Sequence, residues 1–132
     1  MSERYFTPEE ANALLAEIRP LAEEMVGSRR LLAGAEARRA AVLERISGNG
    51  GDFAPSDLAE LAEEVEAHAT ALARAVRELS ALGVQVKDLE RGLVDFPALR
   101  EGEEVLLCWQ LGEDEVGYWH GADDGFAGRQ PL

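Results

Sequence analysis

The sequence predicts an α+β fold in which a long antiparallel two-helix coiled-coil hairpin is followed by a small antiparallel β-sheet of about four strands. Over most of residues 7–82 apolar side chains recur every three or four positions, the period of an amphipathic helix. From residue 83 onward, short apolar runs alternate with glycine-containing turns, as in β-hairpins. A chain of 132 residues has the size of one domain. We therefore divide it into a helical hairpin at 7–82, β-hairpins at 83–120 and an irregular, glycine- and aspartate-rich tail at 121–132.

The first helix is predicted to begin at Thr7 or Pro8. Thr7 can cap the helix, Pro8 fits its first turn, and Glu10 completes a capping box. The expected buried positions alternate in steps of four and three: Leu14, Ile18, Leu21, Met25, Ser28, Leu32, Ala35, Arg39, Val42 and Ile46. Pro20 lies inside this run and removes one backbone hydrogen bond, so we expect a kink there or two abutting helices.

The second helix follows a turn at 47–52, and its predicted cap is Ser56 or Asp57. Its expected buried positions are Leu58, Leu61, Val65, His68, Leu72, Ala75, Leu79 and Leu82. Gly83 is expected to end it. A two-helix hairpin covers only a narrow apolar stripe, so the sheet or a second copy of the chain must cover the rest. We therefore expect a homodimer or higher oligomer formed through helix faces.

The first β-hairpin is predicted to pair residues 84–88 with 93–96 around a three-residue loop. Gly92 then takes the left-handed position of that loop, and Lys87 lies opposite Asp95 as a cross-strand ion pair. Pro97 is expected to end the strand, followed by a connecting loop at 98–102.

The second β-hairpin is predicted to pair residues 105–111 with 115–120. Glycine at the first loop position, Gly112, favours a two-residue type II′ turn. One face then carries Val105, Leu107, Trp109, Leu111, Val116, Tyr118 and His120. The other face carries Leu106, Cys108, Gly117 and Trp119. Both faces are apolar enough that both should be covered.

The charge balance excludes several classes of partner. The 26 acidic and 13 basic side chains give a net charge of −13. Because nucleic-acid affinity comes mainly from Lys and Arg displacing counterions, we expect neither DNA nor RNA as a partner, and no anionic membrane. A single cysteine forms no internal disulfide, and there is no leader-like segment or long apolar run. We therefore expect a cytoplasmic protein.

Three segments carry a resemblance to a known family. They are YFTPEEANALL at 5–15, GVQVKDLERGLVDFPAL at 83–99 and CWQLGEDEVGYWHGADDGFAGRQPL at 108–132. In these segments the chain resembles a bacterial family catalogued as domain-of-unknown-function family 2203, along essentially its whole length. The resemblance implies a single domain and implies no reaction, cofactor, partner or site residue.

Cys108 and His120 are candidates for a nucleophile and base, because a thiol needs a nearby imidazole to become a reactive thiolate. The type II′ register separates them onto opposite faces, whereas a three-residue loop at 112–114 would place them together. A cysteine that packs as a small buried hydrophobe is favoured over this dyad.

Glu64 and His68 are candidate metal ligands, four residues apart on one helix face, and His120 would join them if the sheet packs there. No histidine or cysteine pair stands at short spacing, so a hydrogen-bonded His68 at the helix interface is favoured over a ligand.

The C-terminal half offers a candidate small-ligand site. Arg129 beside Gly125 and Gly128 can cradle an anion, although pairing of Arg129 with a carboxylate is favoured. The candidate ligand-binding residues are Lys87, Trp109, Tyr118, His120 and Arg129. The sequence favours a non-enzymatic interaction or small-ligand-binding protein, with a small anion as the expected ligand. The alternative is a small-molecule or metal-dependent enzyme with its site at the sheet and C-terminal tail; neither cofactor nor catalytic residues can be assigned.

Overall fold

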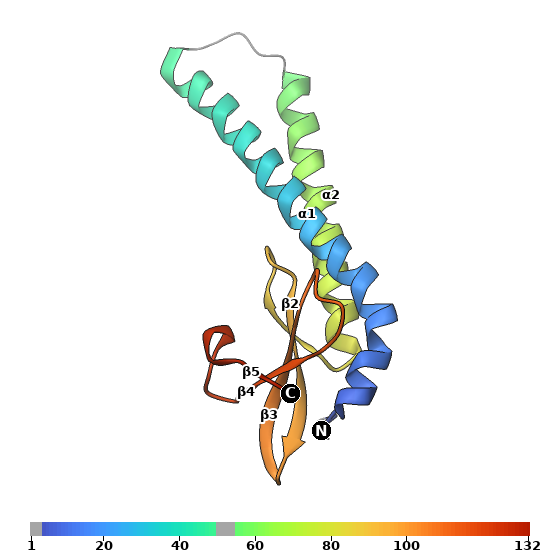
Figure 1. The fold of residues 1–132 in the computed structure, drawn as a ribbon. Helices are drawn as coiled ribbons and strands as arrows, with labels where there is room; N and C mark the ends of the chain where they lie inside the picture. The colour runs from blue at the N-terminus through green and yellow to red at the C-terminus, as the bar shows by residue number, and fades with distance from the viewer. Residues whose placement is uncertain (1–3, 50–54) are drawn as a thin grey trace.

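The computed structural model describes residues 4–49 and 55–132. Helices α1 (Pro8–Asn49) and α2 (Pro55–Ala81) form an antiparallel hairpin, and a five-stranded antiparallel sheet in the order β1-β2-β3-β4-β5 follows. The predicted α+β architecture is therefore confirmed. Figure 1 shows that the sheet packs beside the lower half of the hairpin and that the upper half projects beyond it.

Helix α1 begins as the sequence predicts. The Thr7 hydroxyl accepts the backbone N–H of Glu10 at 3.1 Å, and the Glu10 carboxylate accepts the backbone N–H of Thr7 at 2.9 Å. These two bonds are the expected capping box. The helix then continues unbroken through Pro20 to Asn49, so the alternative of two abutting helices is wrong. Pro20 is exposed, and the helix loses little there beyond one hydrogen bond.

Helix α2 begins before the predicted capping residues. Its first described residue is Pro55, so the predicted capping residues Ser56 and Asp57 lie inside the helix. The predicted turn at 47–52 is helical up to Asn49, and its remainder lies outside the described residues. Gly83 follows the end of α2, as predicted, and its φ of 97° is in the left-handed region that favours glycine.

The two helices pack along the predicted stripe most tightly beside the sheet. Its fully buried members are Ile18, Met25, Ala35, Ala75 and Leu79. Beyond Ala35 the stripe is less covered: Arg39 is exposed, and Val42 and Ile46 are half-buried. The ion pairs Arg74–Glu24 (2.6 Å) and Arg38–Glu64 (2.9 Å) join the helices at the surface.

The main core lies between the hairpin and the inner face of the sheet. From the sheet it contains Val94, Phe96, Ala98, Val105, Leu107 and Trp109, and from the helical half Phe6, Leu15, Ile18, Met25 and Leu79. The rings of Phe6 and Phe96 meet edge to face, with centres 5.3 Å apart. A contact of this kind contributes beyond its buried area.

Strand β2 (Leu93–Arg100) runs through Pro97, so the prediction that this proline ends the strand is wrong. The carbonyl of Pro97 accepts the backbone N–H of Phe6 at 2.7 Å. In an antiparallel strand the N–H and C=O of one residue point to the same side. The missing N–H of Pro97 therefore lies on the side of β2 that faces Phe6, and no hydrogen bond to β3 is lost. On that side the pairing with β1 (Gln85–Asp88) does not extend as far as Pro97. The turn to β3 is Glu101-Gly102, both with positive φ.

The register of β1 against β2 also differs from the prediction. Gln85, and not Lys87, lies opposite Asp95, and a bulge separates Val86 from Asp88. The Asp88 carboxylate accepts the backbone N–H groups of Glu90 (2.9 Å) and Arg91 (3.0 Å), which fixes the turn. Gly92 has a φ of 67° and occupies the left-handed position as predicted.

The connection between β3 (Glu103–Gln110) and β4 (Tyr118–Gly121) is a wide loop over residues 111–117, and the predicted type II′ turn is wrong. Two contacts hold this loop open. The Asn12 side chain accepts the backbone N–H of Val116 at 2.7 Å, and the Trp109 indole N–H donates to the Glu113 carbonyl at 3.0 Å. They replace the strand pairing that the prediction required.

As a result, Cys108 lies opposite Tyr118, and Leu106 lies opposite His120. Tyr118 and His120 therefore share the outer face of the sheet with Cys108, whereas the predicted register placed them with Trp109. The tail beyond β4 is also more regular than expected. It forms a 3-10 turn, η1 (Phe126–Gly128), and a short strand, β5 (Gln130–Pro131), which pairs with β4. No helix within the described ranges is long and apolar enough to cross a membrane.

Candidate metal centre

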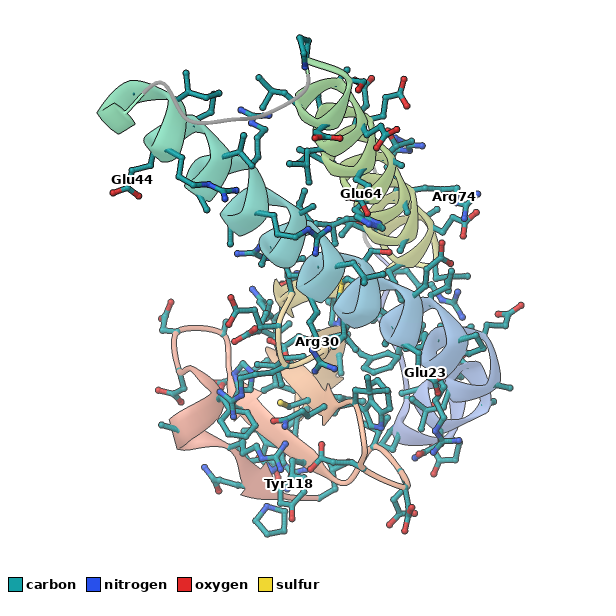
Figure 2. The ribbon with its side chains drawn as sticks, turned by 90° about the horizontal axis from the view of Figure 1, so that it is seen from above. Glu23, Arg30, Glu44, Glu64, Arg74 and Tyr118 are labelled. Atoms are coloured by element: carbon teal, nitrogen blue, oxygen red, sulfur yellow. The ribbon has the colours of Figure 1, made fainter. Side chains whose placement is uncertain are left out.

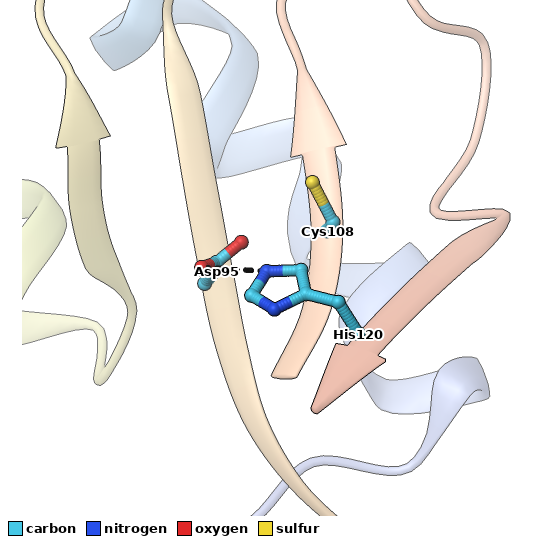
Figure 3. Close-up of side chains that lie close together, drawn as sticks. All are labelled: Asp95, Cys108 and His120. Atoms are coloured by element: carbon cyan, nitrogen blue, oxygen red, sulfur yellow. Dashed lines mark hydrogen bonds and ion pairs between the residues drawn. The ribbon is translucent and has the colours of Figure 1, made fainter. Parts of the chain in front are cut away.

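Three polar side chains meet on the outer face of the sheet, one from each of three neighbouring strands. Asp95 of β2 lies directly opposite Cys108 of β3, and His120 of β4 pairs two residues away, opposite Leu106. One ligand-type atom from each of the three residues lies within 4.8 Å of the other two. The residues are 2%, 0% and 3% exposed, respectively. Figure 3 shows the carboxylate, thiol and imidazole gathered at this point.

The hydrogen bonds of His120 determine which ring nitrogen is available. Nδ1 lies 2.9 Å from the backbone carbonyl of Gly121, which can only accept, so Nδ1 carries a hydrogen. Nε2 lies 3.1 Å from Oδ2 of Asp95. A neutral imidazole then presents a lone pair to a carboxylate oxygen, and two acceptors face each other. This contact requires a cation between the two atoms, either a proton or a metal ion.

The Asp95 carboxylate is incompletely satisfied. Its Oδ1 atom is buried and has no hydrogen-bond partner among the described residues. Burial raises the pKa of Asp95 above its usual range, and the opposing influences of His120, Lys87 and the weak thiol donor of Cys108 do not cancel that effect. An anionic Asp95 therefore needs further positive charge at this position.

The Cys108 thiol is not a ready nucleophile by itself. Burial raises its pKa to about 11, although an Arg129 guanidinium N–H donates to Sγ at 3.7 Å and opposes the rise. At neutral pH the metal-free thiol is protonated, and only the thiolate attacks or binds a metal strongly. Nε2 of His120 faces Oδ2 of Asp95, 3.1 Å away. Cys108 and His120 thus share a face, but the contacts do not form the thiol–imidazole dyad considered from the sequence.

Arg129 ties the C-terminal tail over this cluster. Its guanidinium makes two hydrogen bonds to the Glu113 carboxylate, at 3.1 and 2.5 Å. It also lies 3.8 Å from the Tyr118 ring centre and 4.4 Å from that of Phe126. Burial raises the pKa of Glu113, but the bonds from Arg129 and the Gln110 backbone outweigh it and leave that pKa below its usual value. The favoured reading, that Arg129 pairs with a carboxylate, is confirmed.

A pocket of about 320 Å³ opens beside the cluster. Asp95 and His120 line it, together with Lys87 and Arg91 from the β1–β2 hairpin and Phe126 from η1. Its walls therefore combine the candidate ligands with two cations and an aromatic ring.

The structure places the predicted ligand-binding residues in three settings. Lys87 and His120 line the pocket. Arg129 contacts Cys108 Sγ and the Tyr118 ring, and neither Arg129 nor Tyr118 is a lining residue of the pocket. Trp109 is fully buried on the opposite, inner face of the sheet and does not line this pocket. The register of β3 and β4 is the reason, because it puts Trp109 and His120 on opposite faces.

The metal set predicted from Glu64, His68 and His120 does not come together. Glu64 of α2 binds Arg38 of α1, and Figure 2 shows it on the helical hairpin. One group of potential metal ligands does converge within the described parts of the chain. It consists of Asp95, Cys108 and His120. Asp95 and Cys108 were missed because their spacing matches no ligand motif. The sequence feature that could have indicated them is the presence of a carboxylate and a thiol inside the apolar segments of two successive strands.

No curated protein and no solved structure matches the chain. A family model does match it, over residues 4–132. The chain therefore belongs to the family described as "Uncharacterized conserved protein (DUF2203)".

Proposed function

We propose that the protein binds a divalent transition-metal ion of the zinc class through Asp95, Cys108 and Nε2 of His120. One observation carries the proposal: Nε2 of His120 and Oδ2 of Asp95 face each other at 3.1 Å while Nδ1 is already committed to the Gly121 carbonyl. A metal ion satisfies both acceptors at once. It also supplies a partner for the buried Oδ1 of Asp95, which has none among the described residues.

The donor set supports this class of metal. Thiolate, imidazole and carboxylate together suit zinc and its neighbours, whereas calcium and magnesium prefer oxygen ligands alone. The two positive charges of a divalent ion would neutralise the negative charges of one carboxylate and one thiolate in a site that is almost entirely buried.

The surrounding contacts are those that orient metal ligands. A ligating histidine commonly donates its other ring N–H to a backbone carbonyl, as His120 does to Gly121. The Arg129 N–H on Cys108 Sγ favours the thiolate over the thiol. Both contacts act on the ligand atoms that the proposal uses.

Three protein ligands leave one tetrahedral position for water or a small molecule, the arrangement of a reactive zinc site. Asp95 and His120 also line the pocket, which gives such a molecule a way in. A metal-dependent reaction on a small molecule is therefore favoured over a purely structural ion. A thiol ligand fits the reducing cytoplasm, where we place the protein.

Cobalt(II) titration of the purified chain tests this proposal, because a thiolate–cobalt bond produces a charge-transfer absorption. We expect one equivalent to bind with that absorption and with the visible bands of tetrahedral cobalt. Cys108→Ser should abolish the charge-transfer band, and Asp95→Asn and His120→Ala should each weaken binding by at least about 10-fold. His68→Ala is the matched control and should leave binding unchanged, with folding of every variant checked by circular dichroism.

A wild-type protein that folds but gives no thiolate–cobalt band would overturn the metal site. Loss of cobalt binding in His68→Ala would also contradict it, because the ligands would then lie on the helical hairpin.

Self-association is a second candidate, and exposed apolar residues on α1 favour it. Leu31 and Leu43 are 57% and 43% exposed, on a helix that projects past the sheet (Figure 1). Pairing of two hairpins would bury them, as expected for a homodimer or an interaction module. Light scattering at micromolar concentration should give twice the chain mass, and Leu31→Glu should shift it to the monomer. A wild-type monomer under these conditions removes this candidate.

A further inference from the structure

We infer that the pocket beside the metal centre binds a small molecule through an anionic group, a carboxylate or a phosphate, which Lys87 and Arg91 hold. The inference deepens the proposed function and rests on it, because the same molecule would reach the open position of the metal. It differs from the anion cradle considered from the sequence, which depended on Arg129.

The pocket has the size and composition of a small-ligand site. Its volume of about 320 Å³ is near the lower end of the range for small-molecule pockets. Leu93, Leu106 and Phe126 provide apolar walls, and Asp95 and His120 mark the side of the proposed metal. A compact metabolite fits this space, whereas a polymer does not.

Lys87 and Arg91 are the positive charges that line the pocket, and neither is neutralised by an ion pair within the described residues. The Arg91 guanidinium lies 4.4 Å from the Phe126 ring centre and donates to the neutral Gln110 side chain at 3.3 Å. These contacts hold Arg91 in place and leave its charge unbalanced. Lys87 acts on the Asp95 carboxylate without forming an ion pair with it. On a chain of net charge −13, two pocket cations that form no ion pair within the described residues favour an anionic ligand.

Two of the three carboxylates that line the pocket are engaged elsewhere. One Asp88 oxygen accepts the N–H groups of the β1–β2 turn, and Asp95 belongs to the metal centre. Asp124 is the third, and its carboxylate packs so closely over Gly121 that a Cβ there would lie 2.8 Å from Oδ2. The hydrogen bonds to Asp88 do not cancel the charge of its carboxylate, so Asp88 and Asp124 both oppose an anion. Asp124 is the one that can be removed without disturbing the β1–β2 turn, and its removal should strengthen binding.

The experiment uses cobalt-loaded protein with inorganic phosphate and acetate as probes. A probe that reaches the metal should shift the visible cobalt bands, and calorimetry gives its dissociation constant. We expect Lys87→Gln and Arg91→Gln each to weaken binding about 10-fold, the loss of one charge-assisted hydrogen bond. Asp124→Asn should tighten it. The matched control is Arg45→Gln, which removes one exposed positive charge near the far end of α1 and should have no effect.

The outcomes separate the inference from the proposed function. A shift of the cobalt bands that weakens in Lys87→Gln and Arg91→Gln, but not in Arg45→Gln, supports the anion site. Tighter binding of phosphate than of acetate assigns the site to phosphate compounds, and the reverse assigns it to carboxylates. If cobalt binds normally but neither probe perturbs it, or both variants bind as wild type does, the inference alone is overturned. If cobalt does not bind at all, the metal centre fails and the inference fails with it.

Discussion

The two faces of the sheet share strands but differ in what covers them. Val94, Leu107 and Trp109 point inward, against the helical hairpin, and all belong to one apolar core. Their chain neighbours Asp95 and Cys108 point outward, toward the C-terminal tail. The inner face therefore contains no titratable side chain among these positions, whereas the outer face concentrates a carboxylate, a thiol and an imidazole.

The fold thus places the residues that stabilise it and the residues with reactive groups on opposite faces of one sheet. Two long helices present enough apolar surface to dehydrate a whole sheet face, and any polar group there would be costly. The tail is short, and it covers the outer face with an arginine, an aromatic ring and backbone. Polar groups can persist beneath it because charged and hydrogen-bonding partners are within reach.

The largest contrast is expected between Trp109→Ala and Cys108→Ala, adjacent residues on opposite faces. Removing the fully buried indole should lower the free energy of unfolding by about 3–5 kcal/mol. Loss of its hydrogen bond to the Glu113 carbonyl adds to the effect. Cys108→Ala removes one buried atom and should cost about 1 kcal/mol. Urea denaturation of the metal-free proteins measures both values.

Similar losses for the two variants would show that the faces contribute equally to stability. A loss of less than about 1 kcal/mol for Trp109→Ala would instead mean that the helices do not hold the inner face as described.

A smaller effect is expected from Arg129→Ala, which removes the anchor of the tail. Its paired hydrogen bonds to Glu113 are charge-assisted and partly buried, so the free energy of unfolding should fall by about 1–3 kcal/mol. Amide exchange should accelerate in β4 and β5 and stay unchanged in α1. Arg129→Lys should recover only part of the loss, because lysine cannot make the two-pronged contact. Faster exchange throughout the core would contradict this division between the faces.

The same contact predicts a pH dependence, measured as the difference in free energy of unfolding between wild type and Glu113→Gln. Glu113 has a folded-state pKa below its usual value of 4.5, so its contribution is present above that value. It is lost as the pH falls through the lower, folded-state pKa, where the carboxylate becomes protonated. The difference between the two proteins should therefore be constant near neutral pH and shrink in acid. A difference that grows in acid has the wrong sign for this ion pair.

Local sequence signals determined the elements whose contacts are near in the chain. The Thr7–Glu10 capping box, the left-handed Gly83 and Gly92, and the helical stripe from Ile18 to Leu79 all follow from neighbouring residues, and the structure contains them. The order of a helical hairpin followed by a sheet can also be predicted from the sequence, because helical and strand periodicity occupy separate parts of the chain.

Tertiary contacts decided the features on which the site depends. Asn12, far away in the sequence, binds the backbone of Val116 and opens the β3–β4 loop, which turns His120 toward Asp95 and Cys108. The backbone N–H of Phe6 likewise donates to the Pro97 carbonyl, and β2 continues through Pro97, where the sequence predicted its end. A strand register depends on which distant group satisfies each backbone N–H and C=O, and a shift of one residue moves every side chain to the other face. The sequence by itself therefore determined the helices and the presence of the strands, and only the folded chain determined which polar side chains meet.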